Sequence, residues 1–184
     1  MARFWTSDLH IGHFNVISYT NRPFSTVEEM NETLVANWNE RVSPADTVYV
    51  LGDFSLSLKA VEDYLPRLNG IKVLLIGNHD QPYKKPAKFC PIYRELGFKE
   101  VLPFHQIEIG GHAVLMSHLY YHCDQERVKH LYHPKDNGLF LLHGHSHHPP
   151  DKIFGKRMLD VGVDGHSYYP WSEDEILQVI NNAT

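Results

Sequence analysis

Strand-length apolar runs alternate with helical apolar spacing through the first half of the chain. The runs lie at 3–7, 47–51 and 71–76. Between them, apolar residues recur every three or four positions, as on one face of a helix. This pattern predicts the order strand, helix, strand, helix, strand, with helices covering a mostly parallel sheet. The helical positions are Val27, Met30, Leu34 and Trp38 in the first segment, and Leu58, Val61, Leu65 and Leu68 in the second.

Polar residues mark where helices begin and end. Ser25 with Glu28, and Ser172 with Glu175, match capping boxes that open a helix. The second box predicts a C-terminal helix. Asn69-Gly70 is expected to close the second helix of the first half, because such residues commonly follow the last helical turn.

The second half of the chain is richer in strands. Antiparallel packing of these strands, after a parallel half, suggests two sheets face to face with helices outside. No internal repeat or flexible linker divides residues 1–184, which predicts one domain. The expected elements are a helix at 86–96, a strand at 99–103, a hairpin of 105–109 with 112–117 about Gly110-Gly111, and strands at 139–142 and 157–163.

Composition and charge exclude several classes of protein. Of 184 residues, 42% are apolar and 21% are charged, as in ordinary globular proteins. Lys plus Arg number 17 against 22 Asp plus Glu, and this acidic balance argues against binding to long nucleic acid, which needs a basic face. No apolar run approaches the ~20 residues of a membrane span. An immediate strand leaves no room for a signal peptide. Cys90 and Cys123 lack metal-ligand spacing, so a cytoplasmic protein with reduced thiols is expected.

Histidine is unusually abundant and gathers at the ends of apolar runs. There are 14 histidines, and histidine is the commonest metal ligand and the natural proton carrier near neutral pH. With acidic and amide side chains they follow predicted strands, where open α/β sheets place ligands. Oxygen and imidazole donors without cysteine suit Mn, Fe, Zn or Co. The candidate residues are Asp8 and His10; Asp53; Asn78, His79 and Asp80; His118; and His145 and His147.

Each cluster taken alone has an ordinary explanation. Asp8 and Asp53 could be turn or capping residues, and 77–80 could be a solvated turn. His118 alone fits a histidine satisfied within the fold, and the tract at 145–147 could bind metal adventitiously. The clusters occur together, however, and two divalent ions need about this many ligands. The combination predicts one shared metal site.

The ordered motifs DxH, GD, GNHD, H and GHxH carry a family resemblance. Here they read Asp8-Leu9-His10, Gly52-Asp53, Gly77-Asn78-His79-Asp80, His118 and Gly144-His145-Ser146-His147. The set resembles the calcineurin-like metallophosphoesterases, and the start Ser7-Asp8-Leu9-His10-Ile11-Gly12-His13 looks like the small bacterial and phage members. The resemblance spans 8–147. It implies an α/β fold, a four-layer αββα sandwich of two mixed β-sheets flanked by helices, with a two-metal site.

The resemblance also implies a ligand set. Manganese is the first expectation for both divalent ions, with iron, zinc, cobalt, nickel and magnesium as alternatives. Leu119 follows His118 where many relatives have glycine, which leaves His122 and His112 as alternative ligands, although the strand-end position favours His118. One ion would take Asp8, His10, Asp53 and His147, and the other Asp53, Asn78, His118 and His145, so that Asp53 bridges.

The expected chemistry is phosphoester hydrolysis. Two cations about 3.5–4 Å apart neutralise phosphate oxygens and favour a bridging hydroxide that attacks phosphorus. His79 would act as general acid on the leaving oxygen, with Asp80 orienting its ring. Alternatively, His79 could have only a structural role and support the metal ligands. His13, Arg22 and Asn78 are the expected substrate contacts.

The leading hypothesis is a phosphodiesterase that acts on small or cyclic nucleotides. The segments 81–89 and 119–137 would form a shallow rim with base-stacking aromatics and a lysine such as Lys84, or they could be ordinary surface loops. Asp164 and His166 follow a strand and could approach the site.

The alternative functions are a phosphomonoesterase or nucleotide pyrophosphatase on the same metals, a non-catalytic scaffold, and a metal-storage protein. The expected partner is a small phosphoester, with no membrane and no long nucleic acid, and the chain is expected as a monomer or homodimer.

Overall fold

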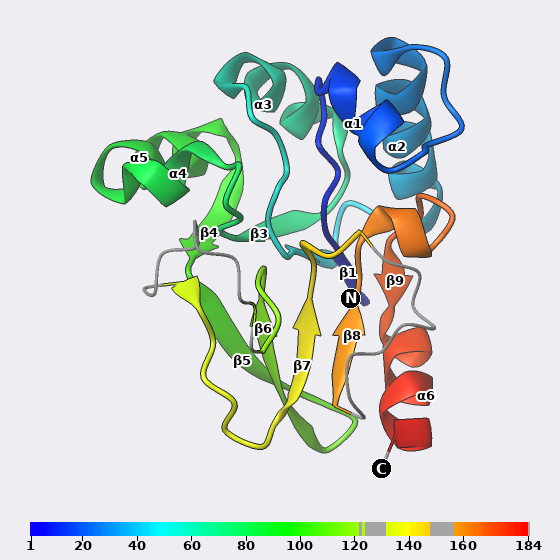
Figure 1. Cartoon of the computed structure of the whole chain (residues 1–184), viewed down its shortest axis with the longest axis vertical. Coiled ribbons are helices and arrows are strands. Elements are labelled where there is room, and N and C mark those ends of the chain that lie inside the picture. Colours follow the sequence, from blue (N-terminus) through cyan, green and yellow to red (C-terminus); the bar gives the residue numbers. More distant parts are fainter. Residues whose placement is uncertain (122, 124–131, 148–156, 184) are drawn as a thin grey trace.

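Two β-sheets form the centre of the fold and share an apolar core (Figure 1). The computed structural model describes residues 1–121, 123, 132–147 and 157–183. The first sheet contains β1 (Arg3–Thr6), β2 (Thr47–Val50), β3 (Ile71–Leu75), β4 (Phe98–Leu102) and β9 (Trp171–Ser172). The second sheet contains β5 (Phe104–Ile109), β6 (His112–Ser117), β7 (Phe140–His143) and β8 (Met158–Asp160).

The first sheet is parallel except at one edge. Its strand order is β4-β3-β2-β1-β9, with β1 to β4 parallel and β9 antiparallel to β1. The parallel part matches the expectation for the first half of the chain. Because β1, β2 and β3 run in one direction, the loops that follow them meet at one edge of the sheet.

The second sheet corrects an expectation from the sequence. Its order is β5-β6-β7-β8, and only the hairpin β5–β6 is antiparallel, whereas β6, β7 and β8 are parallel to one another. The alternation of apolar residues does not record strand direction, and the segments after β6 and after β7 are both long enough for a crossover. Parallel pairing brings the loops after β6 and β7 to the same edge.

Most of the helices lie together on one side of the first sheet, whereas the C-terminal helix lies beside β9 (Figure 1). Met30, Leu34 and Trp38 on α2 pack in one apolar cluster with Val48 and Val50 of β2. The α/β fold with two mixed sheets flanked by helices is therefore confirmed. The helices are α1 (Phe14–Tyr19), α2 (Val27–Arg41), α3 (Leu58–Tyr64), α4 (Gln81–Lys84), α5 (Pro86–Leu96) and α6 (Glu173–Ala183), with short 3-10 turns at Leu65–Arg67 and Val163–Gly165.

A second apolar cluster fills the space between the sheets. Trp5 and Leu75 from the first sheet and Met116 and Leu142 from the second are all buried in it. Ile176 of α6 reaches the same cluster. Successive strand residues point to opposite faces, so β1 places Phe4 in the helix-side cluster and Trp5 between the sheets. The inner faces of the two sheets therefore pack against each other, and this shared core supports the loops at the edge of each sheet.

The helix starts agree with the sequence apart from one residue of register. The α2 N-cap is Thr26, whose hydroxyl accepts from the Glu29 N–H at 3.1 Å, and the Glu29 carboxylate accepts from the Ser25 N–H at 2.8 Å. The predicted Ser25–Glu28 box is therefore wrong by one position, because the same polar pattern occurs twice in succession. The Ser172–Glu175 box is confirmed, with the Ser172 N–H donating to Glu175 at 2.7 Å.

Three further elements differ from expectation. The segment 81–89, expected to be largely irregular, contains α4 at its start, whereas α5 matches the helix predicted at 86–96; each helix has a proline in its first turn. Helix α1 and strand β9 were not expected, because both are too short to show a period. None of the helices in the described part of the chain has the length and apolar character that a bilayer span requires.

Candidate metal centre

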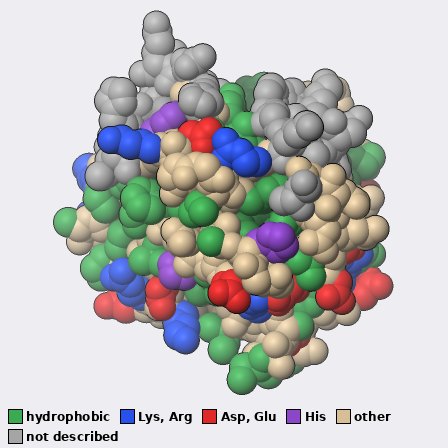
Figure 2. All heavy atoms as spheres, turned by 90° about the horizontal axis from the view of Figure 1, so that it is seen from below, with side chains coloured by type: hydrophobic (Ala, Val, Ile, Leu, Met, Phe, Trp, Pro, Cys, Tyr) green, Lys and Arg blue, Asp and Glu red, His purple; other side chains and the backbone are tan. Residues whose placement is uncertain are grey.

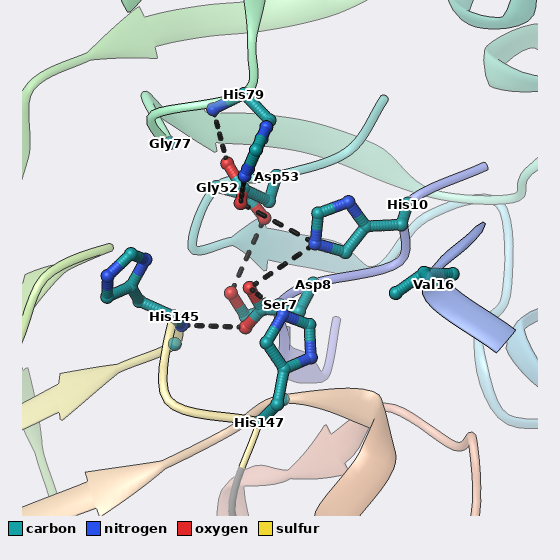
Figure 3. Close-up of polar contacts among 12 residues, drawn as sticks. Ser7, Asp8, His10, Val16, Gly52, Asp53, Gly77, His79, His145 and His147 are labelled. Atoms are coloured by element: carbon teal, nitrogen blue, oxygen red, sulfur yellow. Dashed lines mark hydrogen bonds and ion pairs between the residues drawn. The ribbon is translucent and has the colours of Figure 1, made fainter. Parts of the chain in front are cut away.

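The polar clusters singled out in the sequence converge at one edge of the two sheets (Figure 3). Five loops contribute, namely those after β1, β2 and β3 of the first sheet and after β6 and β7 of the second. Parallel strand direction within each sheet explains the convergence. In chain order the loops carry Asp8 and His10, Asp53, Asn78 and His79, His118, and His145 and His147.

Asp8, His10 and His147 form what we call the first ligand group. One ligand atom from each lies within 4.8 Å of the others. The Asp8 Oδ1 atom is 4.0 Å from His10 Nε2 and 3.8 Å from His147 Nε2. Asp8 and His10 are buried, and His147 is partly exposed. One carboxylate and two imidazoles around a common point are a donor set for a divalent metal ion.

Asp53, His118 and His145 form the second ligand group, with the same composition and the same 4.8 Å limit. The Nε2 atom of His118 lies 3.5 Å from Asp53 Oδ2 and 3.2 Å from His145 Nδ1. Asn78 joins this group, because its Oδ1 lies 2.9 Å from His118 Nε2. The residues expected at the second ion are therefore brought together.

Asp53 lies between the two groups. Its Oδ2 is 3.5 Å from Nε2 of His10 and 3.5 Å from Nε2 of His118. Its other oxygen, Oδ1, accepts from the His79 N–H at 2.9 Å, which fixes the carboxylate against the loop after β3. This is the position that a carboxylate shared by two ions would take.

The ligand loops adopt strained backbone conformations. Few residues other than glycine have positive φ, and each such residue costs of order 1–3 kcal/mol, so strain of this kind clusters at functional sites. Five of the eight non-glycine residues with positive φ among the described residues belong to the two ligand groups, and the others are Asn21, Ser167 and Tyr168. Positive φ occurs at Asp8 (57°), His10 (51°), Asp53 (53°), His145 (71°) and His147 (52°).

Several buried polar atoms at the site have no hydrogen-bond partner in the described part of the chain. They are Asp8 Oδ1, both ring nitrogens of His10, and His145 Nε2. Buried polar atoms are nearly always paired, and an orphan needs an explanation such as a bound ion. Carboxylate oxygens and imidazole nitrogens are metal-donor atoms, and the three residues that carry these atoms all belong to the two ligand groups. The residues present therefore fit divalent metal ions.

The charges of the site divide its imidazoles into two kinds. Burial lowers the pKa of His145 to about 3, with His118 adding to the effect, and burial lowers the pKa of His10 well below its ordinary value. Burial also opposes the charged form of His147 and His118. Asp8 and Asp164 nevertheless raise the pKa of His147 to about 9, and Asp53 and Asp8 raise the pKa of His118. Each ligand group thus holds one neutral and one proton-binding imidazole.

The carboxylates respond in opposite directions. Burial raises the pKa of Asp53, despite the nearby imidazoles. Burial alone would also raise the pKa of Asp8, but His147 and His118 outweigh it, so the pKa of Asp8 is lowered. A divalent ion would favour the ionised form of both.

Glycines allow the ligand loops to approach one another. A Cβ added to Gly77 would lie 2.2 Å from Asp53 Oδ1, and one added to Gly144 would lie 2.5 Å from Asp8 Oδ2. Neither position leaves room for a side chain. The glycines of the GNHD and GHxH motifs therefore permit the contact between loops.

Asp80 has a different role from the one expected. It does not orient the His79 ring, because its buried carboxylate accepts from the N–H groups of Asp53 at 3.0 Å, Phe54 at 3.0 Å and Gly77 at 2.9 Å. These bonds join the loops after β2 and β3. The His79 ring itself is 44% exposed, with Nε2 3.9 Å from Asp53 Oδ2, so it lies over the site.

Arg22 corrects a second expectation. Its side chain has no exposed surface, and its guanidinium donates to Asp164 and to the main-chain oxygens of Asp8 and Leu9. It therefore cannot be the predicted substrate contact in this arrangement. Asp164, which also accepts from His147 Nδ1 at 2.8 Å, carries no local sequence signal beyond its place after a strand.

The remaining histidine candidates separate by position. The His13 ring lies 5.5 Å from the His10 ring and stays a substrate-contact candidate. His112 begins β6, whereas His118 follows its end, so the strand separates His112 from the site. His122 lies outside the described residues. His166 stacks on Trp171 with ring centroids 4.0 Å apart.

Most of the aromatics expected in a substrate rim are buried instead. Tyr83 and Tyr132 pack on each other with ring centroids 4.7 Å apart, and Tyr121 is also buried. Phe89 and Tyr120 are only partly buried, and the Tyr120 ring lies 6.2 Å from that of His145. Lys84 is exposed on α4. On the face seen in Figure 2, basic and acidic side chains are interspersed rather than gathered by sign.

Comparison with known proteins finds relatives along nearly the whole chain. No family model matches. The chain is 35% identical to the "Uncharacterized protein MJ1445" of Methanocaldococcus jannaschii, over 96% of this chain and 90% of that protein. It is 34% identical to the "Gene 66 protein" of Mycobacterium phage L5, over 99% of this chain and 96% of that protein.

One solved structure shows the same fold. The protein of unknown function AQ665 from Aquifex aeolicus matches with a TM-score of 0.75 and 26% identity, over 97% of this chain and 99% of that chain. A structure titled as a novel archaeal phosphodiesterase matches with a TM-score of 0.48 and 19% identity, over 88% of this chain and 82% of that chain, too weakly to bear on function. By its sequence relatives, the chain belongs to the protein family that includes MJ1445 and the gene 66 protein of phage L5.

Proposed function

We propose that this protein is a calcineurin-like metallophosphoesterase that hydrolyses phosphodiesters with two divalent metal ions. The observation that carries the proposal is the place of Asp53, with one carboxylate oxygen 3.5 Å from an imidazole of each ligand group. Asp53 belongs to the second donor set and also approaches His10 of the first set, and a carboxylate shared in this way suits a pair of ions. It is not needed for a single structural ion, which four ligands would close.

The chain's own residues would hold both ions. Asp8, His10 and His147 take one ion, and Asp53, His118, His145 and Asn78 take the other, with Asp53 in contact with both. When bound, two such ions neutralise the oxygens of a phosphoester and lower the pKa of water enough to supply a nucleophile at neutral pH. Manganese suits the mixture of carboxylate, amide and imidazole donors.

His79 has the position of a proton donor to the leaving group. Its ring is partly exposed, and its Nε2 lies 3.9 Å from the Asp53 carboxylate. The Asp53 Oδ1 atom accepts from the His79 N–H at 2.9 Å, which holds the main chain of His79 in place. A histidine so placed can give its proton to an ester oxygen as the bond to phosphorus breaks. His13 and Asn78 would hold the non-bridging oxygens.

An open site supports diesters over monoesters. His79 and His147 keep 44% and 24% of their side chains exposed, and Tyr120 lies beside His145. A phosphate with an ester group on each side needs such open flanks, and an aromatic ring offers a stacking surface to a base. Small or cyclic nucleotide diesters are therefore the proposed substrates.

The test is hydrolysis by the Mn²⁺-loaded protein at matched metal concentration. We expect higher kcat/KM for bis-p-nitrophenyl phosphate and for cyclic nucleotides than for p-nitrophenyl phosphate. Asp63→Asn, on the exposed face of α3, is a control that should keep full activity, since the Asp63 carboxylate pairs with the exposed side chain of Lys59. A preference for the monoester would point to a phosphomonoesterase. Metal uptake without any hydrolysis would point to a scaffold or storage protein.

A further inference from the structure

Arg22 is an arginine with a fully buried side chain, whose donors reach the ligand loop after β1 and the Asp164 carboxylate after β8. Its Nη2 donates to the main-chain oxygen of Asp8 at 2.6 Å, and its Nη1 donates to that of Leu9 at 3.0 Å. These two peptide groups lie in the loop where Asp8 and His10 take positive φ. The guanidinium therefore fixes the strained main chain that carries two members of the first ligand group.

The same guanidinium forms a bidentate ion pair with the Asp164 carboxylate. Arg22 Nε lies 2.7 Å from Asp164 Oδ1, and Nη2 lies 2.9 Å from Oδ2. Only 7% of the Asp164 side chain is exposed, and Thr20 donates to Oδ1 as well. Such planar, bidentate contacts define direction as well as distance, so the Asp164 carboxylate has little freedom to turn.

Asp164 in turn orients the third member of the group. Its Oδ2 lies 2.8 Å from Nδ1 of His147. With its Nδ1 hydrogen on that carboxylate, the His147 ring presents the Nε2 lone pair toward Asp8, whose Oδ1 is 3.8 Å away. A carboxylate bonded to the far nitrogen of a ligand histidine sets both its tautomer and its direction.

Within the part of the chain that the structure describes, the second ligand group has no comparable ion pair. His118 Nδ1 lies 2.8 Å from the main-chain oxygen of Leu51, so the backbone of the first sheet sets the direction of its ring. No Arg or Lys ion pair is recorded at Asp53 among the described residues. The Arg22–Asp164 pair is therefore specific to one of the two groups.

We propose that Arg22 and Asp164 are positioning residues that tighten the binding of a metal ion by the first ligand group, while the second group fills without them. The inference rests on the proposed function, because it needs the two ions, but it concerns which side chains build one of the sites. Thr20 and Arg22 lie before α2, Asp164 follows β8, and His147 follows β7. The pair thus locks a loop of the first sheet to loops of the second.

The main test is Mn²⁺ binding to the full chain, measured by titration calorimetry and elemental analysis. Asp164→Asn offers one acceptor oxygen in place of two and cannot serve Arg22 and His147 together. We expect the wild-type protein to bind two ions, and Asp164→Asn to bind one with unchanged affinity and the other about 10–100-fold more weakly. Arg22→Lys, which loses the planar fork, should weaken the same ion.

Glu173→Gln is the matched control. It breaks another two-pronged arginine–carboxylate pair, between Arg3 and Glu173, at the start of α6. This pair touches no ligand, so both ions should bind as in the wild-type protein. If Glu173→Gln weakened Mn²⁺ binding as much as Asp164→Asn does, the loss would reflect a general decrease in protein stability, and the proposal would be overturned.

A measurement on the wild-type protein guards against variants that fail to fold. In the Zn²⁺-loaded protein, nitrogen-15 NMR should find the His147 proton on Nδ1, shifted downfield and slow to exchange, with Nε2 bound to metal. His147 ligation through Nδ1 would overturn the inference, and so would two unaltered Mn²⁺ sites in Asp164→Asn. A wild-type protein that binds no divalent metal would instead defeat the proposed function, and this inference with it.

Discussion

The two ligand groups have the same composition but are held in different ways. Each contains one carboxylate, one imidazole with a lowered pKa and one with a raised pKa. In the second group, a main-chain oxygen orients His118. In the first group, a buried ion pair orients His147. A ligand set alone therefore does not describe a metal site, because the atoms behind the ligands decide how independently each ion binds.

Loss of the carboxylate between the groups should have the largest effect. Asp53→Asn removes a negative charge that faces imidazoles on both sides at 3.5 Å. We expect activity to be abolished and both ions to bind more weakly, in contrast to the one-ion loss expected at Asp164. Elemental analysis and turnover check this. Two full ions with near wild-type turnover would show that Asp53 is not shared. Asp46→Asn is a suitable control, since the Asp46 carboxylate accepts from the N–H groups of Ala2 and Ser43, which belong to neither ligand group.

Replacement of His79 should leave metal binding by both ligand groups unchanged and should slow only the hydrolysis step. For His79→Asn we expect both ions to stay, with a loss of roughly 10²–10⁴-fold on alkyl diesters, the usual worth of a general acid. The loss on p-nitrophenyl esters should be smaller, because a good leaving group needs little protonation. Equal losses on the two substrates would make His79 a phosphate-binding or structural residue.

Much of this site could be read from the sequence because its signals are local. Each ligand lies within a few residues of the end of an apolar run, and parallel strands bring such ends together. Strand direction in the second sheet could not be predicted. The segments after β6 and after β7 are long enough for either direction, and the alternation of apolar residues is the same in parallel and antiparallel strands. The second sheet was therefore expected to be antiparallel.

The roles of Asp80, Arg22 and Asp164 could not be read for a different reason. Asp80 binds N–H groups of residues 53 and 54, and Arg22 binds Asp164, which is 142 positions away. Such partners are set by the packing of distant loops, and no spacing in the chain records them. A buried arginine and a substrate-binding arginine have the same sequence signature.

The pH dependence of metal binding should separate the groups further. His147 binds a proton with a pKa of about 9 in the metal-free protein, and a metal ion needs the neutral ring. A raised pKa means that the proton competes below that pH, so affinity is lost as pH falls. We expect the affinity of the first group for Mn²⁺ to rise about tenfold per pH unit from 6.5 to 8.5.

Asp164→Asn sharpens this pH experiment. It removes one of the two carboxylates that raise the pKa of His147, so the slope for the first ion should become shallower. The slope for the second ion depends on His118, whose pKa is raised by Asp53 and Asp8 and not by Asp164. Calorimetric titrations at three pH values measure both slopes. A slope that stays steep for the first ion in Asp164→Asn would contradict the assignment of that proton to His147.

The smallest expected effect concerns the side of the site on which a nucleobase lies. Tyr120 is beside the second group, with its ring 6.2 Å from that of His145, whereas the Tyr19 ring lies 6.3 Å from that of His13, which is next to the first group. Tyr120 adjoins a ligand directly, so we expect the base to stack there. Tyr120→Leu should raise KM for cyclic nucleotides roughly fivefold, the value of about 1 kcal/mol of aromatic contact, and should leave kcat and metal content unchanged. Tyr19→Leu, at a side chain that is 73% exposed, is the matched control and should leave KM unchanged. The reverse result would place the base over the first group, and equal KM in both variants would show that neither tyrosine contacts it.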